Sequence, residues 1–418
     1  MTNNNQHIPS GYKPSPLGII PEDWEVKRLR DACDYVDYRG KSPNKSSDGI
    51  FLVTAKNIRD GYIDYNISKE FIPIDEFDET MRRGKAQIGD VLITTEAPLG
   101  HIAQIDNPNI ALAQRVIKYS GKNGLRNTYL KYYLMSEGFQ TILIANATGS
   151  TALGIKGSRL HQLPIIIPST EEQDRIISSL QLWDTAIAKQ TALIEQLTLR
   201  KRGLMQQLLT GKKRLKGFDG EWKRIKLGDI AERITRKNEE NNQNVVTISA
   251  QRGFVVQTEF FNKSVASETL DNYFLVHKDE FCYNKSYSNG YPMGAIKRLK
   301  TFEKAVVTTL YICFALKGET TTNIDFFEQY CESGILNNEL IKVANEGGRA
   351  HGLLNVTPYD FFNMHMSVPS INEQNAIASV LVNVDKEIEI QKQKLAAMQE
   401  QKKGLMQVLL TGKRRIAI

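Results

Sequence analysis

The chain has 418 residues, which is too long for one ordinary domain and predicts two or three. Its composition, 41% hydrophobic and 24% charged, is typical of globular proteins and excludes the disordered, collagen-like and membrane classes. No apolar run approaches ~18 residues, and the polar N-terminus does not fit a signal peptide, so we expect a soluble, cytoplasmic protein. The four cysteines form no CxxC pair, which argues against a disulfide framework or a thiolate zinc site.

The net charge of +7 is unevenly distributed along the chain. Residues 168–215 and 368–418 each contain eight Lys or Arg against five Asp or Glu, whereas the two long blocks 17–167 and 216–367 are close to neutral. A basic chain is typical of nucleic-acid-binding proteins. Because the excess is confined to two short segments, charge alone does not identify such a partner.

The first predicted elements are a tail, residues 1–16, and a mixed domain over residues 17–167. Trp24 stands near the start of this domain, in PEDWEVKRL. The segment GDVLITTEAPLG, at residues 89–100, has the β-branched, apolar composition of a strand followed by a turn. We therefore expect strands as well as helices here.

The next element, residues 168–214, is predicted to be one long helix of about 40 residues, or about 60 Å. Ser169 and Glu172 fit a capping box, and Gly211, followed by basic residues, fits the position just after a helix end. Its apolar residues alternate steps of four and three, as in a coiled-coil seam. The predicted seam residues are Ile176, Leu180, Trp183, Ile187, Ile194, Leu197, Leu204 and Leu208.

The second half of the chain repeats this order, with a second domain at residues 215–368 opened by Trp222 and a second long helix at residues 369–418. Residues 168–214 align without a gap on residues 369–415, with 21 identities in 47 positions. The polar seam residues also coincide, Gln190 with Gln391 and Lys201 with Lys402. The second seam comprises Ile377, Leu381, Val384, Ile388, Leu395, Met398, Leu405 and Leu409. The chain is therefore an internal duplication.

A long helix alone in water is marginally stable, so we expect each copy to bury its seam against the other. An antiparallel pair would have an approximate two-fold axis, whereas a parallel pair would place both domains on one side. Alternatively, each helix could pack on its own domain. Because the helices are alike and the domains differ, we expect two recognition tasks held at a fixed spacing, as for two half-sites of a DNA duplex.

The sequence contains no convincing catalytic motif. Gly40, Lys41 and Ser42 lack the earlier glycine of a phosphate-binding loop, no GxGxxG follows a strand, and no two histidines have HxxxH spacing. Acidic residues near the predicted strands superficially resemble a nuclease cluster but lack its D-x(n)-E-x-K spacing; with Lys285 nearby, they are Asp90, Glu96, Asp279 and Glu280. We expect neither a metal nor a cofactor bound to this chain.

The two domains do contain polar residues mixed with cations and aromatics, a pattern that suits phosphate and base contacts. Any one of these residues could instead be an ordinary solvated side chain. The candidates in the first domain are Arg39, Lys41, Lys45, Lys56, Asn57, Arg59, Thr94, Thr95, Gln114, Arg115 and Lys156. Those in the second domain are Arg236, Lys237, Asn238, Gln251, Arg252, Asn284, Lys285, Tyr287 and Arg349.

Several motifs together resemble one known family. PSxxEQ opens both long helices, GLMQQLLTGKKR and GLMQVLLTGKRR close them, and DYRGKSP, GDVLITTEAPLG and ATGST occur in the first domain. In these motifs the chain resembles the specificity subunit of type I restriction-modification systems over nearly its whole length. The resemblance implies a mixed α/β (α+β) fold: two target-recognition domains with curved sheets, separated by two long antiparallel coiled-coil helices in a pseudo-two-fold repeat.

The resemblance also implies the function and the partners. Each domain would read one half of a bipartite, asymmetric double-stranded DNA target, and the chain itself would not be catalytic. Two methyltransferase subunits would dock on it and restriction subunits would join them, so S-adenosylmethionine, ATP and Mg²⁺ are expected in the partners. Two alternatives stay open: an orphan or inhibitory relative that occupies methyltransferase subunits, and a self-contained nuclease or methyltransferase.

Overall fold

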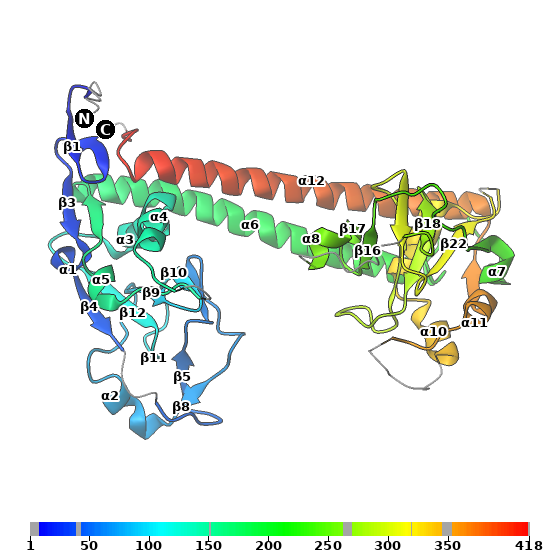
Figure 1. The fold of residues 1–418 in the computed structure, drawn as a ribbon, viewed down its shortest axis with the longest axis horizontal. Coiled ribbons are helices and arrows are strands. Elements are labelled where there is room, and N and C mark those ends of the chain that lie inside the picture. The colour runs from blue at the N-terminus through cyan, green and yellow to red at the C-terminus, as the bar shows by residue number, and fades with distance from the viewer. Residues whose placement is uncertain are drawn as a thin grey trace. The chain divides into compact units, whose positions relative to one another are not determined.

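The computed structural model describes residues 8–38, 43–149, 152–261, 270–318, 320–344 and 353–416. The chain forms two compact units, the first made of Met1–Gln190 and Lys394–Ile418, and the second of Thr191–Gln393. Each unit contains one predicted recognition domain and a part of each long helix (Figure 1). The mixture of helices and small sheets in both units confirms the predicted fold class.

The first unit is built on an antiparallel four-stranded sheet. Its strand order is β10 (Leu99–Gln104), β9 (Val91–Thr95), β12 (Val116–Gly121), β4 (Cys33–Asp37). A smaller sheet has the order β11 (Ile110–Leu112), β5 (Ile50–Val53), β8 (Phe71–Ile72). The remaining strands form three two-stranded pairs: β1 (Tyr12–Ser15) with β2 (Gly18–Pro21), β3 (Glu25–Arg28) with β13 (Pro164–Ile167), and β6 (Ile58–Arg59) with β7 (Tyr62–Ile63). The short helices are α1 (Leu29–Ala32), α2 (Phe77–Thr80), α3 (Asn127–Met135), α4 (Glu137–Ala145) and α5 (Gly157–Leu160).

The second unit is also built on a four-stranded antiparallel sheet. Its strand order is β20 (Ala295–Arg298), β19 (Phe281–Asn284), β22 (Ile312–Leu316), β15 (Ala231–Ile234). The paired strands are β14 (Lys223–Lys226) with β23 (His365–Val368), β16 (Val246–Ser249) with β17 (Gly253–Val256), and β18 (Phe274–His277) with β21 (Lys304–Val307). The short helices are α7 (Leu227–Ile230), α8 (Gln257–Phe261), α9 (Ile324–Glu332), α10 (Asn337–Val343) and α11 (Pro358–Asn363).

The duplication extends through both recognition domains at the level of the fold. The order β10-β9-β12-β4 in the first unit corresponds to β20-β19-β22-β15 in the second. The strands that enter and leave each domain pair with each other in both units, β3 with β13 and β14 with β23. The predicted strand within residues 89–100 is β9, and β19 is its equivalent in the second unit. Two domains of dissimilar sequence therefore share one scaffold.

The two long helices, α6 (Thr170–Leu208) and α12 (Ile371–Leu409), have 39 residues each, close to the predicted length. Ser169 and Ser370 cap them by accepting a hydrogen bond from the backbone three residues later. Gly211 and Gly412 adopt left-handed φ angles of +69° and +71°, as expected just after a helix end. No helix within the described ranges is both long and apolar enough to span a membrane.

The two helices run in opposite directions in each unit. In the first unit, Ile176 and Leu180 near the start of α6 share one core with Met406 and Leu409 near the end of α12. In the second unit, the end of α6 shares a core with the start of α12, through Leu208 and Leu381 among others. This excludes the parallel pair, and all sixteen predicted seam residues are buried or half-buried. Each helix packs both on a domain and on the other helix.

Charged residues that are identical in the two repeats pair across the helices. The repeat offset is 201, so each pair in one unit has a counterpart in the other with the roles of the two helices exchanged. Such reciprocal contacts are the signature of a two-fold interface. The pairs are Arg415–Glu172 and Lys402–Asp184 in the first unit, and Arg214–Glu373 and Lys201–Asp385 in the second.

These pairs correct the predicted capping boxes. The serine half of each box forms, but the glutamate does not turn back to its own helix start. Glu172 accepts hydrogen bonds from Arg415 and from the indole N–H of Trp24, at 2.8 Å, and Glu373 accepts from Arg214. The basic residues after each helix were expected to interact with the helix dipole, and the arginine of each set reaches the partner helix instead.

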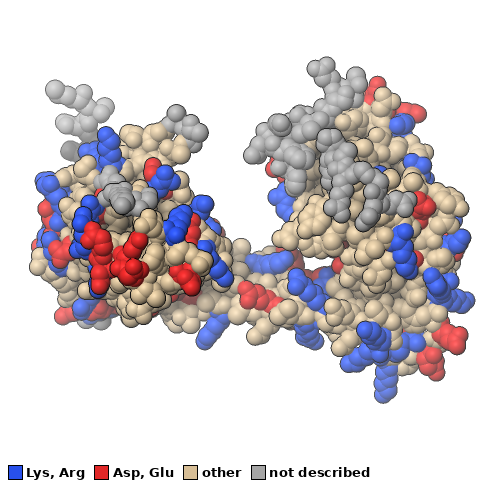
Figure 2. All heavy atoms as spheres, turned by 90° about the horizontal axis from the view of Figure 1, so that it is seen from below, with Lys and Arg blue, Asp and Glu red and all other residues tan. Residues whose placement is uncertain are grey.

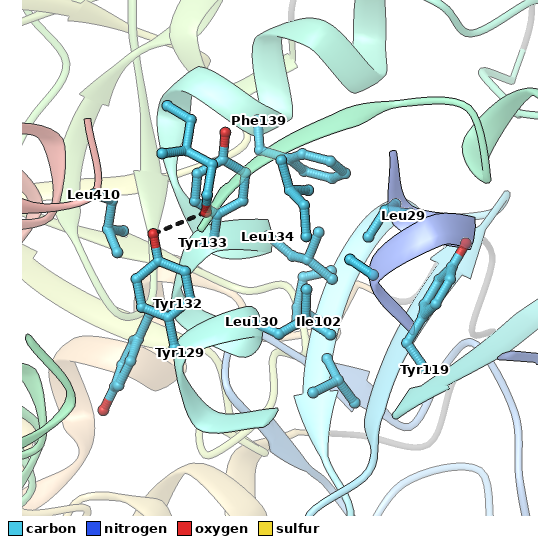
Figure 3. Close-up of a cluster of buried hydrophobic side chains, with 14 of the residues drawn as sticks. Leu29, Ile102, Tyr119, Tyr129, Leu130, Tyr132, Tyr133, Leu134, Phe139 and Leu410 are labelled. Atoms are coloured by element: carbon cyan, nitrogen blue, oxygen red, sulfur yellow. Dashed lines mark hydrogen bonds between the residues drawn. The ribbon is translucent and has the colours of Figure 1, made fainter. Parts of the chain in front are cut away.

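The core of the first unit lies between the four-stranded sheet and the helices. Figure 3 shows Tyr129, Leu130 and Leu134 of α3 packed with Ile102 of β10, and Leu410, which follows α12, in the same cluster. The hydroxyl of the fully buried Tyr129 donates to the carbonyl of Ile166, 3.1 Å away. Burial raises the pKa of this phenol well above its usual value. The end of α12 thus contributes directly to the core of the first unit.

Candidate nucleic-acid interface

In the first unit, backbone hydrogen bonds bring three segments together at the end of β9. The N–H of Thr95 donates to the carbonyl of Arg115, which precedes β12, at 2.8 Å. The carbonyl of Thr95 accepts from the N–H of Ile155 at 2.9 Å, and Glu96 forms a bridge to Gly154. Residues distant in sequence, including the predicted Thr95, Gln114, Arg115 and Lys156, therefore lie on one surface.

Two hollows open on this surface, and Gln114 and Arg115 line both of them. The first, of about 280 Å³, is also lined by the predicted Lys45 and Lys56. The second, of about 300 Å³, is also lined by Lys156. Arg115 is exposed and pairs with Glu96 at 2.5 Å, while Lys45 pairs with Glu70 at 2.9 Å. We call the lining of the two hollows the first reading surface.

Three of the predicted residues are fully or almost fully buried and are used inside the fold. Asn57 accepts from the backbone and hydroxyl of Thr54 and donates to two carbonyls, so it fixes the turn after β5. Thr94 accepts from the backbone of His101 on the neighbouring strand β10. Asn238 holds the loop after β15 through Asn242. Because their polar groups are occupied, we leave these three out of the proposed interface. Arg59 is half-buried at the end of β6.

In the second unit, the loop after β19 and the turn between β16 and β17 lie together. Gln251 donates to the carbonyl of Asn289 at 2.9 Å, and Asn284 donates to the carbonyl of Ile248 at 3.3 Å. Tyr287 is 68% exposed, and Arg252 is exposed in the turn. Lys285 is half-buried, and burial lowers its pKa. We call five predicted residues the second reading surface: Gln251, Arg252, Asn284, Lys285 and Tyr287.

The other predicted cations of the second unit lie against β18. Arg236 pairs with Glu280 at 3.0 Å, and Lys237 donates to the carbonyl of Asn272 at 2.7 Å. The ammonium of Lys237 also lies 4.9 Å from the centre of the Phe274 ring. Arg39, Lys41 and Arg349 lie outside the described residues.

Asp90 and Glu96, two of the acidic residues that superficially resembled a nuclease cluster, do not lie together. Asp90 precedes β9 and Glu96 follows it, and at ~3.3 Å per residue a strand of this length holds them at opposite ends. Asp90 is buried in an ion pair with Lys118, 2.5 Å apart. Within the described ranges, no three His, Cys, Asp or Glu side chains form a group that could hold a metal ion.

On the face that Figure 2 shows, basic and acidic side chains both occur in each unit. This agrees with the nearly neutral charge of both recognition domains. Neither recognition domain therefore has a net positive charge that would attract phosphates strongly.

Sequence reasoning missed part of the first reading surface. Glu96 was considered only as a nuclease residue, although it directly follows β9 and contacts Arg115. Thr148 and Gly154, which form a small backbone-bonded turn beside it, were missed as well. The signal available for Glu96 was its position at the end of the predicted strand in GDVLITTEAPLG.

Comparison with known proteins gives a consistent result. The family model for the type I restriction modification DNA specificity domain matches the chain twice, over residues 21–199 and 219–400. A putative type I restriction enzyme MjaX specificity subunit from Methanocaldococcus jannaschii is 27% identical over 439 aligned positions, which cover 97% of each chain. The MjaIX specificity subunit of the same organism is 29% identical over 199 positions, or 45% of each chain.

Two solved structures share the fold. The S subunit of a type I restriction-modification system from M. genitalium superposes with a TM-score of 0.51 at 17% identity, covering 93% of this chain and 96% of that one. A chain from a structure of type I R-M complex assembly and conformational transition superposes with a TM-score of 0.56 at 16% identity, covering 94% and 99%.

Proposed function

The chain belongs to the family of type I restriction-modification DNA specificity domains and is a specificity subunit, and we propose that each of its two units reads one half of a bipartite, asymmetric DNA target. The chain contributes DNA recognition rather than catalysis to its complex. Its family membership implies DNA, methyltransferase and restriction subunits as partners.

One observation carries the proposal for two half-sites: the same scaffold presents different side chains at equivalent places. Glu96 bridges to Gly154 in the first unit, and Ser286 bridges to Leu353 at the corresponding place in the second. The first reading surface offers Arg115 and Gln114, while the second offers Tyr287, Lys285 and Asn284. Since different donors and acceptors select different base pairs, the two half-sites should differ in sequence.

The reciprocal helix pairs support a fixed spacing and two copies of one partner. Glu172 and Glu373, each paired with an arginine of the other helix, make the helix ends equivalent in the two units. A pseudo-two-fold scaffold offers two equivalent docking places, which suits two methyltransferase subunits. In this proposal S-adenosylmethionine, ATP and Mg²⁺ are bound by the partner subunits, and the complex works in the cytoplasm, where its DNA is.

A chimaera tests the proposal. Residues 249–289, which contain all five residues of the second reading surface, are replaced by those of another family member. The full chain is produced with its methyltransferase subunit, and the methylated sites are mapped by single-molecule sequencing. We expect one half-site to change and the other half and the spacer to persist. A change in both halves, or no bipartite site with the unchanged chain, would refute the proposal.

Two alternatives give different results. An orphan or inhibitory relative would occupy methyltransferase subunits without directing them to a target, and the same methylation map would then be empty. A self-contained nuclease or methyltransferase would cut or methylate DNA when the chain alone is incubated with DNA, Mg²⁺ and S-adenosylmethionine. We expect no such activity from the chain alone, because family membership assigns it recognition.

A further inference from the structure

We infer that Glu96 and Arg115 form a specificity-determining pair that reads a guanine in the half-site of the first unit. The inference rests on the proposed function and adds to it the kind of base read at one position. Glu96 acts as a positioning residue, because it would hold the arginine side chain that touches the base.

The first observation is the geometry of the pair. The Nε of Arg115 lies 2.5 Å from a carboxylate oxygen of Glu96, and both side chains are about half exposed, at 56% and 47%. Arg115 lines both hollows of the first reading surface and so stands between them. An arginine that is paired through Nε has further N–H donors on its two terminal NH₂ groups, and these two groups can make a bidentate contact.

The second observation is the backbone at this place. Arg115 has a φ of +70° and Ala97, next to Glu96, has a φ of +45°. Non-glycine residues rarely adopt this left-handed region, and such residues gather at binding sites held in place by their surroundings. Here the hydrogen bond from the Thr95 N–H to the Arg115 carbonyl holds the strained residue. A glycine would fit this backbone without strain. The presence of an arginine at a strained position therefore indicates that its side chain has a role.

The chemistry of the pair selects a base over a phosphate. An arginine fork matches the O6 and N7 acceptors of guanine in the major groove, and the bidentate contact discriminates between bases. The carboxylate of Glu96 neutralises the arginine and would repel a nearby phosphate, so the pair is a poor phosphate anchor. The arginine of the pair therefore suits the guanine of a G·C base pair.

The test measures base preference in the complete complex. The full chain and its methyltransferase subunit modify a plasmid library in which the target is randomised, and methylated sites are sequenced. Arg115→Lys keeps the charge but loses the fork, and Glu96→Gln keeps the size but loses the charge. We expect both variants to lower the preference for G·C at one base pair by roughly 5- to 100-fold. That base pair should lie in the half-site that persists in the 249–289 chimaera.

The matched control is another exposed arginine–carboxylate ion pair in the same unit. Glu79 of α2 and Arg82, which follows this helix, lie 2.8 Å apart and line neither hollow. Arg82→Lys and Glu79→Gln make the same chemical changes and should leave every base preference intact. Restoring a carboxylate with Glu96→Asp should recover part of the discrimination, which a purely structural role at this position would not predict.

Two results would overturn the inference. If Arg115→Lys leaves all base preferences unchanged, Arg115 reads no base. If the Arg115 variants weaken binding equally for all sequences and reduce its salt dependence, the arginine contacts a phosphate. Both results leave a bipartite target in place, whereas failure of the proposed function would remove that target from the unchanged chain as well.

Discussion

Removing the carboxylate of Glu172 should destabilise the first unit strongly. Glu172 is 5% exposed and accepts from the indole N–H of Trp24 and from two nitrogens of Arg415, at 3.0 and 2.6 Å. Glu172→Ala leaves the indole N–H buried without a partner, at a cost of about 1–3 kcal/mol. Losing a fully buried ion pair costs about 3–5 kcal/mol, but Arg415 is 43% exposed and keeps Asp23, so its share is smaller. We expect a total of about 3 kcal/mol.

The second unit supplies the control. Glu373→Ala makes the same change, but there the buried indole nitrogen of Trp222 has no hydrogen-bond partner among the described residues, so no such bond is lost. The indole share of about 1 kcal/mol should therefore be absent there. The ion-pair share should be larger than in the first unit, because the Arg214 side chain is only 26% exposed. Urea unfolding followed by far-ultraviolet circular dichroism measures both variants, and hydrogen exchange assigns each loss to its unit.

A double-mutant cycle isolates the indole bond. Trp24→Phe and Glu172→Ala should show a coupling of about 1 kcal/mol in the free energy of unfolding, because either change alone already breaks the bond. No coupling in the cycle would refute the reasoning.

Three further predictions concern packing, pH and spacing. Leu180→Ala empties a fully buried seam position and should lower the free energy of unfolding by about 3 kcal/mol, whereas Leu182→Ala, at a 71% exposed position, should cost less than about 0.5 kcal/mol in the same urea assay. Burial raises the pKa of Tyr129, so the folded state holds the phenol proton more tightly than the unfolded state does. The free energy of unfolding should therefore be constant up to pH ~10 and fall above it. A free energy of unfolding, measured in urea, that is unchanged across that pH would contradict this. Inserting Ala-Glu-Ala-Lys after Gln190 and after Gln391 adds about 6 Å to each helix, so the methylation map should show a spacer longer by about one or two base pairs, while an unchanged spacer would show that the helices do not set it.

Much of the fold could be predicted because its signals are periodic or repeated. The heptad seam and the 201-residue offset predicted both long helices, the serine at the start of each and their pairing partner. The antiparallel direction, which is confirmed, was predicted only by the family resemblance, since Ile176 and Leu180 could face either end of α12 equally well by pattern alone. The common sheet order of the two domains was also hidden, because strand pairing depends on burial and length rather than on residue identity.

The candidate site was less predictable. Polarity identified Arg115 and Gln114 but also selected Asn57 and Asn238, because a polar side chain that fixes a loop has the same sequence signal as one that contacts a ligand. Glu96 was missed for the opposite reason: its partner Arg115 is 19 positions away and becomes a neighbour only through the pairing of β9 with β12. Identical residues in the two repeats were more reliable guides, since Glu172, Lys201 and their counterparts all form cross-helix pairs.

The way each domain is attached to the helices favours exchange of whole domains. Gln173, buried at the start of α6, accepts from the backbone N–H of Arg126, and Gln374, at the start of α12, accepts from the backbone N–H of Asn323 in the same manner. Backbone groups are present whatever the side chain, so these joints make no demand on the residue type that a domain brings to them. A new domain inserted at these positions could form the same backbone hydrogen bonds with the starts of the helices. A population could therefore gain a new target by recombination without changes in the two long helices.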